Sequence, residues 1–160
     1  MIEGPFFALT LLAALGCGLI AGVFFAFSTS VMRTLGALPW KQGLTAMQKL
    51  NVLIINPVFL GVFVGTAVLS VVVAVMTFVI WPDEGAWELL IGCALYLVGC
   101  FGVTVAANIP RNDALDKLDP ESPESAEQWQ TYVKEWTAWN HVRGAGALAA
   151  CAALVLALAA

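Results

Sequence analysis

The chain has 160 residues, of which 61% are hydrophobic and only 11% are charged. Soluble domains carry roughly a quarter charged residues, so this composition excludes an ordinary soluble domain and indicates a single membrane domain, residues 1–160. A net charge of −4, with basic residues scattered along the chain, excludes a nucleic-acid-binding surface.

Four long apolar runs divide the chain, at residues 6–27, 52–80, 89–107 and 142–160. Each approaches or exceeds the ~20 residues that a helix needs to cross the hydrocarbon core of a membrane. We therefore predict an all-α, polytopic membrane protein with a bundle of four transmembrane helices. Their approximate ranges are 5–34, 41–80, 86–108 and 123–160.

The first predicted helix contains small residues and aromatic rings at separate levels. Gly18 and Gly22 form a Gly-x-x-x-Gly seam, which lets a neighbouring helix approach closely. Phe24, Phe25 and Phe27 follow one turn later. Packing is the simpler role for these rings, and the alternative is that they wall an apolar cavity.

The second predicted helix begins after a break at residues 36–39. A buried stripe with a spacing of three residues is expected at its start, formed by Leu44, Met47, Leu50 and Leu53. Pro57 then predicts a kink beside Asn56, which either builds a polar pocket or only bends the helix. Gly61 and Gly65 form a second seam.

The last predicted helix is too long for the membrane alone. A short acidic turn at residues 81–85 precedes the third helix, and a loop rich in acids and proline follows it. Ser122 and Pro123 are typical of a helix start. A helix from there to residue 160 would be roughly 55 Å long, so its first half must project into the cytoplasm or lie on the surface.

All seven basic residues lie in or beside the first and third connections. They are Arg33, Lys41, Lys49, Arg111, Lys117, Lys134 and Arg143. The positive-inside rule then places connections 34–41 and 109–135 in the cytoplasm and both termini outside. We expect an integral protein of a bacterial-type inner or plasma membrane, in contact with membrane lipid.

Polar side chains from three helices are predicted to meet near the cytoplasmic end. They are Gln48, Asn51, Asn56, Asn108, Arg111, Asn112, Asn140, His141 and Arg143. Amides at membrane depth need partners, so we expect a shared network. On the last helix, Trp136, Asn140 and Arg143 share one face, with Trp139 over Arg143, while His141 lies about 100° away. The alternative is that Arg143 reaches the headgroups and the amides only tie helices together.

Metal and thiol chemistry have little support in the sequence. A single histidine cannot supply the imidazoles of the usual copper, zinc or iron sites within one subunit, so we predict no metal site and no cofactor. A metal or haem would require a symmetric oligomer or other ligands. Four cysteines lie in apolar runs without charged neighbours and are predicted to be buried and unreactive.

Several motifs in the expected order resemble the anthrone oxygenase-like family of small four-helix membrane proteins. They are Ala-Gly-Val-Phe-Phe-Ala-Phe-Ser at residues 21–28, Met-Gln-Lys-Leu-Asn at 47–51 leading to Asn-Pro-Val-Phe at 56–59, Val103-Thr104 leading to Asn-Ile-Pro-Arg-Asn at 108–112, and Trp-Asn-His-Val-Arg at 139–143. The resemblance spans nearly the whole chain.

This resemblance implies oxidation of an anthrone-type phenol to a quinone by O₂ without flavin or haem. In that case His141 is the candidate base, and the candidate donors to the substrate oxygens include Arg143, Asn56, Asn108 and Asn140. Gln48, Asn51 and Asn112 complete the expected binding site, and Phe27, Trp136 and Trp139 could hold the flat rings. The alternative function is a non-catalytic membrane subunit or a lipid- or quinone-binding protein. Small-residue seams allow a monomer or a homo-oligomer.

Overall fold

A computed structural model describes residues 2–160, and every regular element among them is helical. The elements are α1 (Gly4–Ala26), the π-helical η1 (Phe27–Val31), α2 (Met32–Ala37), α3 (Trp40–Leu53), α4 (Pro57–Ile80), α5 (Ala86–Ala94), the π-helical η2 (Leu95–Gly102) and η3 (Thr104–Asn108), α6 (Ile109–Leu115) and α7 (Ser125–Ala159).

Four continuous helical stretches are long and apolar enough to cross a membrane, namely Gly4–Ala37, Pro57–Ile80, Ala86–Leu115 and Ser125–Ala159. The predicted all-α class, with four candidate spans and a long last helix, is therefore confirmed. The composition and length of the four spans indicate an integral membrane protein.

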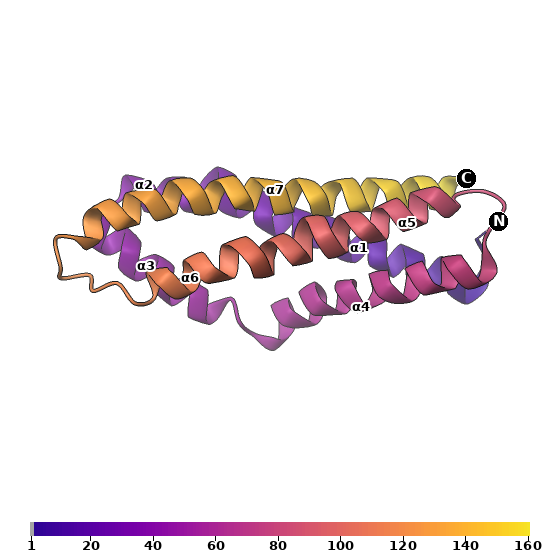
Figure 1. Cartoon of the computed structure of the whole chain (residues 1–160), viewed down its shortest axis with the longest axis horizontal. Helices are drawn as coiled ribbons and strands as arrows, with labels where there is room; N and C mark the ends of the chain where they lie inside the picture. Colours follow the sequence, from indigo (N-terminus) through magenta and orange to yellow (C-terminus); the bar gives the residue numbers. More distant parts are fainter. Residues whose placement is uncertain (1) are drawn as a thin grey trace.

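The long helices lie side by side, and the two chain ends meet at the same end of the molecule (Figure 1). α7 runs along the whole length, and α1 packs against it more extensively than any other pair of elements does. α2, α3 and α6 gather at the opposite end, beside the loop that leads into α7. All seven basic residues of the sequence belong to this half or to the middle of α7.

The interior consists of two clusters of buried apolar side chains. The larger cluster lies between the membrane spans, and the smaller one lies at the end that holds α2, α3 and α6. The smaller cluster contains Met32, Leu35, Leu44, Met47, Leu115, Trp129, Tyr132 and Trp136. Leu44 and Met47 belong to the stripe that the sequence predicts for the second helix, and both are fully buried, but the prediction is wrong for Leu53, which is 69% exposed at the end of α3.

One close backbone contact between two membrane spans lies outside both predicted glycine seams. A Cβ added to Gly146 would lie 2.8 Å from the carbonyl carbon and oxygen of Gly99, so α7 and η2 touch there through bare backbone. A Cβ on Gly22, Gly61 or Gly65 would meet no atom within 4 Å. The expectation of close internal contacts at those three glycines is wrong, because no neighbouring helix lies within contact distance of a Cβ there.

The predicted helix 41–80 is also wrong as a single helix. It is two helices, α3 and α4, separated at residues 54–56. Asn56 adopts an extended conformation and its Oδ1 accepts from the N–H groups of Val58 and Phe59, at 3.1 and 3.0 Å. Asn56 is therefore an N-cap and Pro57 the first residue of a new helix, a pairing that favours a break over a kink.

The third span runs further than predicted, to Leu115 instead of residue 108. π-helical turns occupy most of residues 95–108, and Pro110 then falls in the first turn of α6. Because the helical stretch is continuous across this point, Pro110 removes one backbone donor inside a helix, and local π turns such as those before it accommodate prolines in membrane helices. The last helix begins at Ser125, whose hydroxyl donates to the carbonyl of Asp119 at 2.8 Å.

Candidate functional site

An aromatic pocket of about 200 Å³ lies where the two buried clusters meet. Its walls come from α1, η1, α3, the first turns of α4, η3, α6 and α7. We call it the aromatic pocket, and its main lining residues are Phe24, Phe27, Asn51, Phe59, Phe63, Thr104, Asn112, Trp136 and Arg143. The break between α3 and α4, which bulges away from α6 in Figure 1, contributes Ile54 and Ile55 to the same lining.

Arg143 is the only charged residue in this lining. Its side chain lies between two rings, with the guanidinium carbon 3.9 Å from the centroid of Phe24 and 5.1 Å from that of Trp136. Nε donates to Oδ1 of Asn140 at 2.9 Å, and Nη1 donates to Oγ1 of Thr104 at 3.3 Å. Arg143 is buried and has no carboxylate partner among residues 2–160.

Asn140, on α7, links Arg143 to the first span. Its Nδ2 donates to the carbonyl of Phe24 at 2.8 Å and to Oγ of Ser28 at 2.6 Å, and all these groups are buried. Thr104 is held in turn by a bond to the carbonyl of Cys100 at 2.9 Å. An arginine has five N–H donors, and these contacts use two, so three remain available to a ligand.

Two more predicted amides lie at the pocket wall. Oδ1 of Asn112 accepts from the hydroxyl of Tyr132 at 3.0 Å and from Nε1 of Trp136 at 2.8 Å. Asn51 approaches Oδ1 of Asp116 at 3.4 Å. The aromatic pocket thus brings together five of the residues expected at the site, namely Phe27, Asn51, Asn112, Trp136 and Arg143.

The other predicted amides hold the backbone instead of lining the pocket. Nε2 of Gln48 donates to the carbonyls of Leu115 and Leu118, both at 3.0 Å, and so ties α3 to the end of α6. Asn56 caps α4. Asn108 is completely buried, where its Nδ2 donates to the carbonyl of Trp136 at 3.3 Å and its Oδ1 has no hydrogen-bond partner.

His141 and Trp139 lie on other faces of α7. His141 is exposed and lines grooves between α7 and the first span, not the aromatic pocket. Trp139 does not stack on Arg143 as expected. It is 39% exposed, and its ring centroid is 5.8 Å from the guanidinium carbon of Arg111. The helical rotation of 100° per residue explains the position of His141, which is about 100° from Asn140 and 200° from Arg143. Trp139 is only about 40° from Arg143 on the helix, and its ring instead lies outside the pocket, beside Arg111.

Sequence reasoning missed the rings that α4 contributes. Phe59 and Phe63, one turn apart, stack with centroids 5.7 Å apart, and Phe63 also stacks on Phe101 at 5.2 Å. An i, i+4 aromatic pair directly after the Asn56 cap is the signal that could have identified them. Thr104 could have been identified as the hydroxyl one turn before Asn108.

Within the described chain, no three His, Cys, Asp or Glu side chains form a group that could hold a metal ion, and the four cysteines are free. Neither the curated proteins nor the solved structures include a match to the chain. A family model described as anthrone oxygenase matches residues 58–153, more than half of the chain, and this segment contains Thr104, Asn140 and Arg143. The chain belongs to the anthrone oxygenase family, whose name describes an oxygenase.

Proposed function

We propose that the protein oxidises a hydrophobic, anthrone-type phenol with O₂ and that the aromatic pocket binds this substrate. The observation that carries the proposal is Arg143, a buried cation without a carboxylate partner between aromatic rings. A buried charge is costly unless it is paired, so such a site favours an anionic ligand. The surrounding rings favour a flat, apolar one.

The chemistry needs a stabilised anion more than it needs a strong base. Loss of a proton from the activated methylene of an anthrone leaves the negative charge mainly on the ring oxygen, as a phenolate. The free N–H groups of Arg143 would donate to that oxygen, and the low-dielectric pocket would strengthen the interaction. We assign to Arg143 the stabilisation of this anion.

The atoms and electrons of the oxidation then balance without an added reductant. The anion transfers electrons to O₂, and a bond forms between the former methylene carbon and oxygen. Loss of water from the resulting hydroperoxide leaves a second carbonyl, so that CH₂ and O₂ become C=O and H₂O. The pocket lining contains no histidine, aspartate or glutamate, so in this proposal the proton passes to water at the pocket mouth, not to His141.

We further propose the membrane orientation that the basic residues indicate, with both termini outside and the α2, α3 and α6 end in the cytoplasm. A tag on the C-terminus should then be accessible to an antibody in cells whose outer barrier alone has been opened. A tag inserted after Asp119 should be accessible only after the plasma membrane is disrupted. The reverse pattern would contradict the orientation.

The test of the function is anthrone-dependent O₂ uptake by the purified protein. Arg143→Met should abolish uptake, and Arg143→Lys should retain part of it because a charge remains. Arg111→Met is the matched control, because Arg111 pairs with Glu135 at 3.0 Å outside the pocket. Full uptake by folded Arg143→Met protein would contradict the assignment. Tight binding of anthrones or quinones without turnover would favour the non-catalytic alternative.

A further inference from the structure

Besides the aromatic pocket, the structure has two grooves between the first span and α7. One, the basic groove, has a volume of about 430 Å³ and is lined by residues that include Arg33, Gly36, Lys134, Thr137 and His141. The other, the apolar groove, has a volume of about 420 Å³. Ser28 and His141 line both grooves, so the two form one continuous surface.

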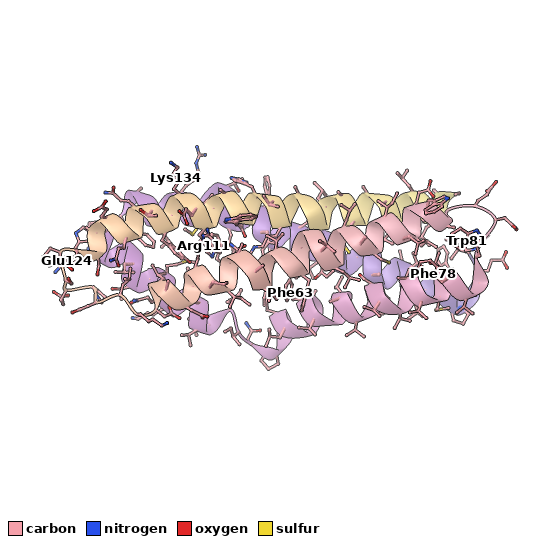
Figure 2. The ribbon with its side chains drawn as sticks, viewed as in Figure 1. Phe63, Phe78, Trp81, Arg111, Glu124 and Lys134 are labelled. Carbon is pink, nitrogen blue, oxygen red and sulfur yellow. The ribbon has the colours of Figure 1, made fainter. Side chains whose placement is uncertain are left out.

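The basic groove carries unbalanced positive charge. Its lining contains Arg33 and Lys134 and no acidic side chain. The two ion pairs in residues 2–160 involve Lys41 and Arg111, so neither cation of the groove is neutralised. Figure 2 shows Lys134 projecting away from the helices. Thr137 also lines the groove, and its Oγ1 is shielded and has no hydrogen-bond partner.

The apolar groove continues from this basic end along the spans. Gly22 and Gly144 leave space between α1 and α7, and a Cβ on Gly22 would meet no atom within 4 Å. Phe25 and Leu148, which also line the groove, are 69% and 62% exposed. Apolar side chains this exposed on a membrane span are solvated by lipid tails.

The two grooves are spaced like the parts of a phospholipid. Arg33 is eleven residues beyond Gly22 in the first span, and Lys134 is ten residues before Gly144 in α7. At 1.5 Å per residue, both cations therefore lie roughly 15 Å along the helices from the glycines of the apolar groove. One leaflet accounts for about half of the ~30 Å hydrocarbon core, so an acyl chain below a phosphate in the basic groove reaches the level of Gly22 and Gly144.

We propose that this surface binds one anionic phospholipid. The phosphate lies in the basic groove, where Arg33 and Lys134 contact it, and an acyl chain lies along the apolar groove over Gly22 and Gly144. Charge selects the headgroup and the groove accepts the tail, so a zwitterionic lipid of the same chain length binds less well. This site does not depend on the proposed oxygenase activity.

The test compares lipids retained by the full-length protein after detergent extraction. Native mass spectrometry would measure binding of phosphatidylglycerol and phosphatidylcholine with identical chains. In the Arg33→Gln/Lys134→Gln variant, the ratio of phosphatidylglycerol to phosphatidylcholine affinity should fall roughly 25-fold, because each cation near the surface contributes about a factor of five. The control, Lys49→Gln/Lys117→Gln, removes the same charge from the same end of the molecule, outside the groove, and should keep the preference.

A third variant tests the tail and separates a lipid from a soluble phosphate. Gly22→Leu adds a side chain in the apolar groove, at a position where a Cβ meets no atom within 4 Å, and should weaken phosphatidylglycerol binding while both cations remain. Equal losses in the groove variant and the lysine control would overturn the proposal in favour of a general surface charge effect. Thermal stabilisation by inorganic phosphate equal to that by phosphatidylglycerol, or unchanged lipid binding by Gly22→Leu, would overturn it too.

Discussion

The substitution Asn140→Asp tests the charge of the aromatic pocket with almost no change of shape. Asn140 accepts from Nε of Arg143 at 2.9 Å, so an aspartate there would form an ion pair with Arg143 and keep it in place. The new carboxylate would lie roughly 6 Å from an anion held on the far side of the guanidinium. At an effective dielectric constant of about 20, it would repel that anion by about 3 kcal/mol.

A loss of about 3 kcal/mol corresponds to roughly 100-fold weaker binding of an ionised phenol. The assay is titration of the detergent-solubilised protein with an apolar phenol above its pKa and with the methyl ether of the same compound. Only the ionised phenol should bind more weakly, because the ether carries no charge. The carboxylate also loses the Nδ2 donor to Phe24 and Ser28, so its effect on folding needs a control.

Ser28→Ala is the matched control, because it removes the 2.6 Å contact with Asn140 and adds no charge. It should lower the free energy of unfolding and leave the ratio of phenol to ether affinity unchanged. If Asn140→Asp weakens the ether as much as the phenol, the loss is one of shape, and an electrostatic role for Arg143 is refuted. The same holds if neither ligand is affected in the folded variant.

Three further predictions concern α7 and the segments packed against it. Gly146→Ala should destabilise the protein by about 1–3 kcal/mol, because its Cβ would meet the backbone of Gly99. Gly22→Ala is the control and should not destabilise the protein, because its Cβ would meet no atom within 4 Å. Unfolding titrations with a denaturing detergent compare the two variants. Asn56→Ala should cost about 1 kcal/mol in the same titration, since it removes the α4 cap, and should leave phenol affinity unchanged. His141→Gln should keep the phenol affinity of the parent protein, measured by the phenol titration described for Asn140→Asp, because His141 lies outside the pocket. A large loss of phenol affinity would show that His141 contributes to the site.

The fold could be predicted because hydropathy reports burial in lipid directly. Twenty apolar residues can satisfy their backbone groups in lipid only as a helix, so the four runs fix four spans. The helix ends could not be predicted as well, because they depend on side-chain contacts. The sequences around Pro57 and Pro110 both look like breaks or kinks. The structure starts a new helix at Pro57, after the Asn56 cap, and continues the third span through Pro110.

The candidate site could be predicted in part, for a similar reason. Sequence reasoning correctly put Asn140 and Arg143 on one face, since their spacing of three residues is a helical period. It could not tell which amides turn to a backbone carbonyl. Gln48 reaches the carbonyls of Leu115 and Leu118 in a distant segment, and Asn108 reaches the carbonyl of Trp136, and no sequence pattern records contacts of that range.

The polar residues of α7 separate into two stripes with different chemistry. Trp136, Asn140 and Arg143 recur at i, i+4 and i+7 and face the protein interior. Lys134, Thr137 and His141 recur at i, i+3 and i+7 and line the basic groove. One helix can therefore present a shielded cation to a flat substrate and an accessible cation to a lipid headgroup. Phe24 lines both the aromatic pocket and the apolar groove, but the two cations lie on different faces of α7, so substitutions of Arg143 and of Lys134 test the two proposals separately.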